Sequence, residues 1–157
     1  MTVMRTCDEI TLTEYRSRIG QVLGLSEWLE VSQRMIDQFA DVTGDRQFIH
    51  VDALAAARTS FGTTIAHGFL TLSLLSHMSF SAVPRIAGAR MSINYGMNSV
   101  RFITPVRSGA RIRGEFRLKG CAERESDQWQ SVLEVSVAIE HAEKPALVAE
   151  WLNVTFM

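Results

Sequence analysis

Asp45 and His50 stand five positions apart, and the pair His67-Gly68 begins seventeen residues after His50. A carboxylate and an imidazole on one short loop can hold a water molecule between them and activate it by general acid–base catalysis. A glycine amide that starts a buried helix, as expected at Gly68, can polarise a carbonyl group. These residue types at this spacing therefore indicate an enzyme that activates water.

Each of these four residues also has a structural interpretation. Asp and His on loops are commonly cap or turn residues, and a lone buried histidine more often bonds a backbone group than reacts. Gly68 can be glycine for close packing alone. The joint spacing of Asp45 and His50, together with the later His-Gly, favours a catalytic role for this pair. His67 itself is expected to be structural.

The composition fits one globular domain and indicates no special class of binding partner. The chain has 157 residues, which is the size of one domain with a real hydrophobic core, so we expect a single domain over 1–157. Its 16 basic and 17 acidic residues give a formal charge of -1. This charge gives no reason to expect nucleic acid or an anionic membrane as the main partner.

Cysteine content and the apolar segments indicate a cytoplasmic protein. Cys7 and Cys121 have no metal-ligand spacing and are too few for a disulfide framework, which favours a reducing compartment. Residues 1–9 resemble neither a signal peptide nor an anchor. The longest apolar stretch, Phe69 to Val83, is interrupted by hydroxyl groups and is shorter than the about 20 residues that span a bilayer.

Helix signals dominate the first half of the chain. Residues 11–14, Thr-Leu-Thr-Glu, fit a capping box for a helix that Gly20 can end. Residues 24–30 are expected to form a loop or a short strand. Ser32 can cap a second helix, whose apolar stripe ends at Gly44.

The candidate pair falls between helices. Asp45 follows the end of the second expected helix, and Asp52 can cap a third helix over Ala53 to Arg58. His50 is therefore expected just ahead of that third helix. This places the pair on an interhelical loop, where the backbone is free to take an unusual geometry.

The second half changes to a period of two. Residues 111–118 and 133–140 alternate apolar with polar side chains, which is typical of antiparallel strands with one wet face. Residues 99–106 and 146–156 complete a set of about four strands. The last of these is apolar on both faces, so we expect it at the centre of the sheet or at an interface.

A long helix from Gly68 to about Val83 remains to be covered. Its apolar residues are spread nearly all round the helix, and a sheet that wraps it is the natural way to bury them. The sequence therefore predicts an α+β roll in which an antiparallel sheet surrounds one long central helix.

The motifs in this order and spacing resemble the MaoC-like dehydratases, the hotdog-fold family that contains the (R)-specific enoyl-CoA hydratases. The similarity covers roughly residues 25–157. The chain departs from the commoner pattern at Gln47-Phe48, where Asn-Pro is usual, and this variant is similar to the nodulation protein N-like subgroup. The matching residues are Phe39-Ala40, Gly44-Asp45, His50, Asp52, Gly62, the run Ile65-Ala66-His67-Gly68, then Asn94-Tyr95-Gly96, the run Arg101 to Val106, and Gly109.

The resemblance implies a hotdog fold and the syn addition of water to a trans-2-enoyl thioester, or the reverse dehydration. It implies that Asp45 and His50 are catalytic, that the Gly68 amide serves as the oxyanion hole, and that Ser73 supports the pair. Ser73 has an alternative, which is to satisfy a backbone carbonyl within its helix. Which of Asp45 and His50 is the base stays open, because coupled groups titrate as a pair.

Partners and cofactors follow from the same resemblance. The substrate would be an acyl-CoA or an acyl-carrier thioester, with coenzyme A present only as part of the substrate and no cofactor or metal. Arginines 85, 90, 101 and 107 are candidates for the coenzyme A phosphates, although a solvated face explains each of them equally well. A single hotdog leaves one sheet edge open, so we expect a homodimer.

Other chemistries fit the sequence less well. It contains no Gly-x-Ser-x-Gly motif, no cluster with zinc spacing and no glycine-rich phosphate loop. His77 and His141 have no partner pattern and are expected to be structural or exposed. The alternatives that remain are a hotdog acyl-CoA thioesterase and a non-catalytic protein that binds acyl thioesters.

Overall fold

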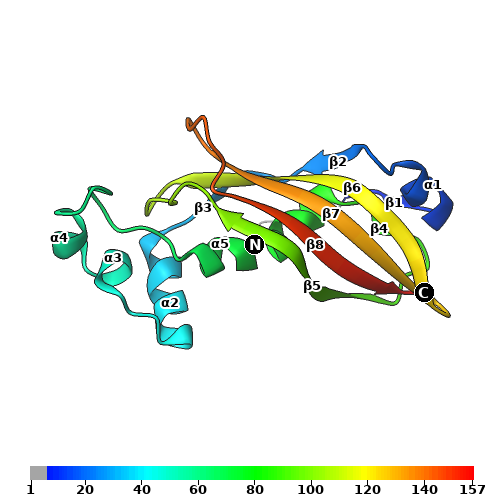
Figure 1. The fold of residues 1–157 in the computed structure, drawn as a ribbon, viewed down its shortest axis with the longest axis horizontal. Helices are drawn as coiled ribbons and strands as arrows, with labels where there is room; N and C mark the ends of the chain where they lie inside the picture. Colours follow the sequence, from blue (N-terminus) through cyan, green and yellow to red (C-terminus); the bar gives the residue numbers. More distant parts are fainter. Residues whose placement is uncertain (1–6) are drawn as a thin grey trace.

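The computed structural model describes residues 7–157 and is organised around a six-stranded antiparallel sheet (Figure 1). The strand order is β2-β6-β7-β8-β5, and the short β3 also pairs with β6. A separate pair, β1 with β4, is parallel. The strands are β1 (Glu9–Ile10), β2 (Val22–Leu25), β3 (Leu29–Glu30), β4 (Arg85–Ile86), β5 (Met91–Phe102), β6 (Arg111–Glu125), β7 (Gln128–Ile139) and β8 (Leu147–Phe156).

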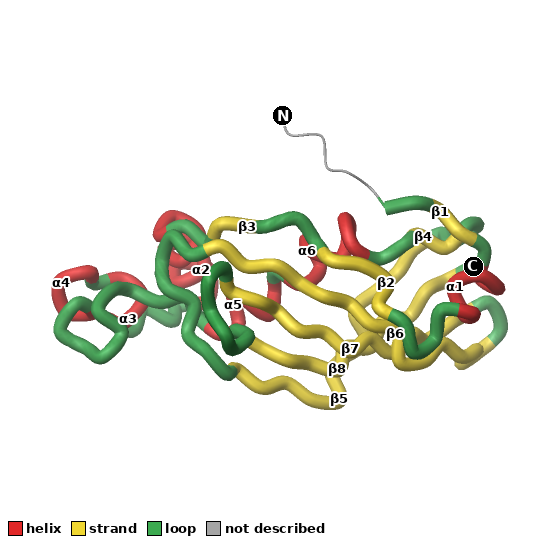
Figure 2. The backbone as a smooth tube through the Cα atoms, turned by 90° about the horizontal axis from the view of Figure 1, so that it is seen from above, coloured by secondary structure: helices red, strands yellow, loops and turns green. Residues whose placement is uncertain are grey.

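The helices lie in three places relative to this sheet. The helices α5 and α6 lie along one face of it, while α2, α3 and α4 project beyond one end and α1 lies at the other (Figures 1 and 2). Their bounds are α1 (Leu12–Ser17), α2 (Gln33–Thr43), α3 (Phe48–Val51), α4 (Ala53–Ala56), α5 (Gly68–Ser73) and α6 (Leu75–Ala82). Within residues 7–157, no helix has the length and apolar character needed to cross a bilayer.

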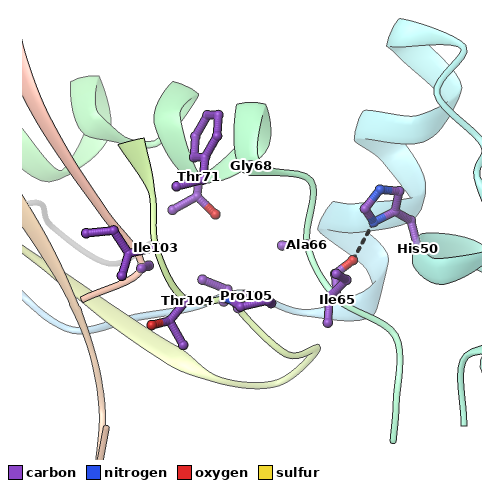
Figure 3. A pocket seen from close by; sticks show the side chains of 11 residues that line it. His50, Ile65, Ala66, Gly68, Thr71, Ile103, Thr104 and Pro105 are labelled. Atoms are coloured by element: carbon purple, nitrogen blue, oxygen red, sulfur yellow. Dashed lines mark hydrogen bonds between the residues drawn. The ribbon is translucent and has the colours of Figure 1, made fainter. Parts of the chain in front are cut away.

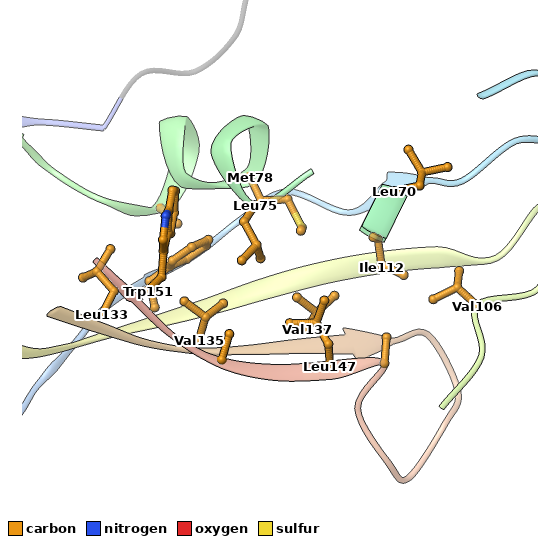
Figure 4. Close-up of a cluster of buried hydrophobic side chains, with 14 of the residues drawn as sticks. Leu70, Leu75, Met78, Val106, Ile112, Leu133, Val135, Val137, Leu147 and Trp151 are labelled. Atoms are coloured by element: carbon orange, nitrogen blue, oxygen red, sulfur yellow. The ribbon is translucent and has the colours of Figure 1, made fainter. Parts of the chain in front are cut away.

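The core lies between α5–α6 and the sheet (Figure 4). Leu75 and Met78 of α6 are 1% exposed and face apolar side chains of β7 and β8. Burying each such side chain contributes about 1.5–3 kcal/mol. Two aromatic rings close the core beside them, Phe116 and Trp151, with centroids 6.5 Å apart. The predicted α+β architecture, a sheet packed around a central helix, is confirmed.

The central helix differs from the prediction in its continuity. It is divided at Leu74 into α5 and α6, whereas the apolar pattern predicted one helix. Ser73 donates its hydroxyl to the carbonyl of Phe69, a type of bond that tends to bend helices. The sheet also leaves part of the helical surface open, since Phe69 is 67% and Phe80 58% exposed.

The predicted helix starts in the first half are confirmed, whereas α1 ends at Ser17, before Gly20, and α4 ends at Ala56 rather than at Arg58. The Thr11 hydroxyl accepts the amide of Glu14, and the Ser32 hydroxyl accepts the amide of Met35. Gly44 ends α2 in the left-handed conformation with φ 78°. The α2 helix therefore has both of its ends fixed, and Asp45 follows directly.

The loop expected around His50 is in part helical. His50 lies inside the four-residue helix α3. Its backbone is therefore held more rigidly relative to Asp45 than it would be on a loop. So short a helix has no apolar period to detect, and its first residue has no side-chain cap. The Asp52 carboxylate accepts the amide of Ala55 at 2.9 Å, which confirms the predicted cap of α4.

The expected set of four strands was too small. The strand β5 begins at Met91 rather than near Ser99, and almost all of its side chains are exposed or half-buried. It is the edge strand beside β8. Its first half alternates Met91, Ile93, Tyr95 and Met97 with polar residues or glycine, so a period-two signal was present in the sequence and was missed. The strand β8 lies between β7 and β5, as its two apolar faces predicted.

Replacing Gly44 by Ala should destabilise the protein by about 1 kcal/mol, because an L side chain disfavours the left-handed conformation that ends α2. The measurement is the free energy of unfolding from chemical denaturation. Gly44→Asn is the matched control, since Asn tolerates this conformation better than Ala. Equal stability of the Ala and Asn variants would contradict this account.

Candidate active site

His50 is 6% exposed, and its ring is hydrogen-bonded to the segment that precedes α5. Its Nδ1 lies 2.7 Å from the carbonyl oxygen of Ile65 (Figure 3). Because a carbonyl oxygen only accepts, Nδ1 carries the proton and Nε2 is left as an acceptor. A backbone bond of 3.0 Å from the Ile65 amide to the Ile49 carbonyl joins the same two segments.

Gln33 on α2 bridges these segments from a third direction. Its amide nitrogen donates to the carbonyl of His50 at 2.8 Å, and its amide oxygen accepts the Thr64 hydroxyl at 2.5 Å. Both ends of the Gln33 amide are therefore used to hold the backbone around His50. The sequence offered no signal for this role, because Gln33 lies at an unremarkable position in the first turn of a helix.

Asp45 is exposed and held loosely by its own turn. Its carboxylate accepts the Gln47 amide at 3.5 Å, and its amide donates to the Thr43 hydroxyl at 3.4 Å. Both distances exceed the usual range of about 2.7–3.2 Å for N–H···O bonds. One side-chain ligand atom from each of Asp45, His50 and His67 lies within 4.8 Å of the others. The fold thus brings together the predicted pair and adds His67 to it.

His67 is 3% exposed and contacts both members of the predicted pair. Its Nε2 lies 2.9 Å from the backbone oxygen of Asp45. Its ring stacks on His50 with centroids 3.8 Å apart and an angle of 25°, and Phe39 lies at 4.9 Å. The backbone hydrogen bond expected for His67 is present, whereas its contact with His50 was not foreseen.

The three side chains do not have the geometry of a metal site. The rings of His50 and His67 are stacked in nearly parallel planes, and ring lone pairs lie in the ring plane. Two such lone pairs cannot both point at one ion between them.

A cavity of about 250 Å³ opens beside His50 (Figure 3). Its wall is mainly apolar, which suits an acyl group. The buried Thr71 of α5 also lines it, one turn after Gly68, with its hydroxyl directed toward the cavity. Sequence reasoning missed Thr71, although its spacing of three from Gly68 places both on one helix face. Further lining residues are Ile65, Ala66, Phe102, Pro105, Val106 and Ala146.

Gly68 begins α5 and lines the same cavity. A Cβ at this position would lie 3.0 Å from the ring of Phe102, which would have to shift, so close packing favours glycine here. Its amide belongs to the first turn of the helix, where N–H groups have no acceptor within the helix. The packing interpretation and the proposed oxyanion role are therefore compatible.

Ser73 lies apart from the pair. It is exposed, and its hydroxyl donates to the Phe69 carbonyl at 2.7 Å. This is the structural alternative that the sequence left open. Within the described residues, Ser73 has no hydrogen bond to Asp45 or His50, so a supporting role would require a contact that this structure does not contain.

The remaining candidates lie outside the cavity. Arginines 85, 90, 101 and 107 are all exposed and none of them lines it, which fits the solvated-face interpretation. His77 and His141 are exposed as well. Burial raises the pKa of the Cys121 thiol, and burial followed by the nearby Asp8 raises that of Cys7. A raised pKa keeps both thiols protonated and poor as nucleophiles.

Residues 14–141 match the family model of the MaoC like domain, so the chain belongs to the MaoC-like dehydratase family. It is 51% identical over 147 residues to nodulation protein N of Rhizobium leguminosarum bv. viciae, covering 93% of this chain and 91% of that protein. It is also 40% identical to 3-hydroxyacyl-thioester dehydratase Z of Mycobacterium tuberculosis, over 94% and 95% of the two chains.

Solved structures of the family share the fold. The (R)-hydratase from A. caviae involved in PHA biosynthesis superposes with a TM-score of 0.69 and 26% identity, over 86% of this chain and 94% of that one. The chain therefore has a hotdog fold, as the resemblance implied. Its relatives include proteins named as dehydratases and hydratases as well as nodulation protein N, so hydro-lyase chemistry is established for the family and not for each member.

Replacing Gln33 by Met should lower the free energy of unfolding by about 2 kcal/mol, because the His50 carbonyl and the Thr64 hydroxyl both lose a partner. Chemical denaturation measures the change. Arg34→Met on the exposed side of the same helix is the matched control and should have little effect. Equal effects of the two substitutions would argue against the bridging role.

Proposed function

We propose that the protein hydrates trans-2-enoyl thioesters to (R)-3-hydroxyacyl thioesters, and catalyses the reverse dehydration, with Asp45 and His50 activating water. The observation that carries the proposal is the approach of these two side chains within 4.8 Å, with His50 lining a mainly apolar cavity. The names of the dehydratase and hydratase relatives support the same reaction class.

In this mechanism one water supplies all the atoms that are added. As its oxygen bonds to C3 of the substrate, a proton passes to the pair, and the pair returns a proton to C2 on the same face. The neutral imidazole of His50 offers Nε2 as an acceptor, because its Nδ1–H is engaged by Ile65. The reaction needs no cofactor, and coenzyme A takes part only as the thiol half of a substrate whose thioester bond stays intact.

The thioester oxygen gains negative charge as C3 is attacked. The Gly68 amide is the proposed donor to this oxygen, since it lies at the cavity wall without an acceptor in its helix. The ring of Phe102 lies against Gly68 and would help to exclude water from the developing charge. The substrate class is an acyl-CoA or an acyl-carrier thioester whose acyl group enters the cavity.

A homodimer is the proposed assembly. The edge strand β5 has no partner on its outer side within the described chain, and an open edge favours pairing. Exposed apolar side chains cluster on this strand and the adjoining segments: Met91, Ile93, Tyr95, Phe102 and Ile103, together with Phe69 and Phe80. A second copy paired at this edge would satisfy the open strand and would also cover the exposed apolar side chains.

The proposed reaction predicts that Asp45→Asn and His50→Ala each lower the hydration rate of crotonyl-CoA or longer enoyl-CoAs by about 10²-fold or more. The measurement is the loss of the conjugated enoyl-thioester absorbance. Asp52→Asn is the matched control, because Asn also caps α4 and leaves the pair untouched.

Thiol release separates this reaction from its nearest alternative. Hydration leaves the thioester intact, whereas a thioesterase would release free coenzyme A. Thioester cleavage without hydration would replace the proposal by thioesterase activity, and binding without turnover would replace it by a binding function. Hydration by the Asp45 and His50 variants at the rate of the wild-type protein would refute the role of the pair.

The assembly predicts an apparent mass of twice 17.6 kDa by light scattering. Tyr95→Lys should shift the population toward the monomer, because the ring is exposed on β5 and a charge there would be buried on pairing. Glu143→Lys, exposed in the turn between β7 and β8, is the control and should leave the mass unchanged. A wild-type mass of one chain would refute the dimer.

A further inference from the structure

The buried His67 is the point at which the two sequence motifs of the site meet. It precedes Gly68 and caps α5, while its ring reaches back to the backbone of Asp45 and the face of His50. We propose that His67 is a positioning residue, whose Nε2–H bond to the Asp45 carbonyl holds the Asp45 carboxylate at a fixed place relative to His50. This inference rests on the proposed function and concerns a residue that the mechanism above does not use.

The hydrogen bonds fix the tautomer of His67. The Asp45 carbonyl oxygen can only accept, so the proton must be on Nε2 at 2.9 Å from it. The other nitrogen, Nδ1, is then an acceptor, and it is buried without a hydrogen-bond partner within the described residues. An unpaired buried acceptor is unfavourable and rare in folded proteins. A histidine that served packing alone would gain by being replaced with an apolar ring.

The contacts of the ring fix the direction of its one hydrogen bond. His50 stacks against it at 3.8 Å and Phe39 lies at 4.9 Å, which holds the plane of the His67 ring. His50 is itself clamped by its bond of 2.7 Å to Ile65. The donor of His67 and the imidazole of His50 are therefore parts of one rigid unit.

Asp45 depends on this unit because its own turn holds it weakly. Its carboxylate and amide make contacts of 3.5 and 3.4 Å within the turn, whereas the bond from His67 is 2.9 Å. The shortest hydrogen bond on Asp45 in the described chain thus comes from 22 residues away. A displacement of about 1 Å in a reacting group can lower a rate by about 10²-fold.

The matched pair His67→Gln and His67→Met tests the donor. The amide nitrogen of Gln is as many bonds from Cβ as the imidazole Nε2, and Met has a similar length with no donor. We expect Gln to keep kcat for enoyl-CoA hydration within about 3-fold of wild type, and Met to lower it about 10- to 100-fold. KM should change little in both, because neither substitution alters the cavity wall.

A third variant, His67→Phe, separates positioning from packing. It keeps an aromatic ring between Phe39 and His50, removes the unpaired acceptor and removes the donor. We expect its kcat to fall as in the Met variant while its unfolding midpoint stays at or above that of wild type. Equal kcat in the Gln and Met variants, or losses of kcat that follow the unfolding midpoint in all three, would overturn the inference.

The ¹⁵N chemical shifts of the histidine rings test the same inference without turnover. Wild-type His67, assigned by its absence in the Gln variant, should show a protonated Nε2 and an unprotonated Nδ1. The opposite tautomer would overturn the positioning role by itself, even if hydration is observed. A wild-type protein that shows the expected tautomer but hydrates no enoyl thioester would instead refute the proposed function.

Discussion

The apolar segment that becomes α5 and α6 is the constraint on which the rest of this structure depends. A helix with large apolar side chains on most of its faces needs cover, and the antiparallel sheet provides it with the residues that alternate inward along β6, β7 and β8. Leu75 and Met78 are buried almost completely as a result. Because this packing fixes the line of the helix, it also fixes where the first turn of α5 begins.

That first turn is where the candidate chemistry lies. Gly68 and Thr71 face the cavity from α5, and His67, one residue earlier, reaches the segment that carries Asp45. Gln33 of α2 fixes the other half of the site, because its amide nitrogen donates a hydrogen bond to the backbone carbonyl of His50. The projecting helices α2 to α4 are held both by these polar bonds and by apolar contacts, since Ile36 and Ala40 of α2 and Ala56 of α4 are fully buried (Figure 1). Stability and geometry of the site are therefore linked.

The same packing leaves a surface that the chain does not cover. The edge strand β5 is exposed along almost its whole length, and the exposed Phe69 of α5 lies against Phe102 of this strand with ring centroids 5.7 Å apart. Phe102 lies at the end of this strand and also packs on Gly68, so the open edge and the cavity share a wall. Binding of a partner at the β5 edge would therefore contact Phe102, which also lines the cavity.

The sequence by itself determined the local elements, the fold class and the candidate pair. Thr11, Ser32, Gly44 and Asp52 act through neighbours within four residues, and period-two alternation reports burial directly, so local chemistry was sufficient for them. Tertiary structure decided the break at Leu74, the bridge by Gln33 and the stacking of His67 on His50. The bridge and the stacking depend on how α2, α3 and α5 approach one another across 15 to 31 residues of chain, and no pattern of neighbouring side chains encodes that approach.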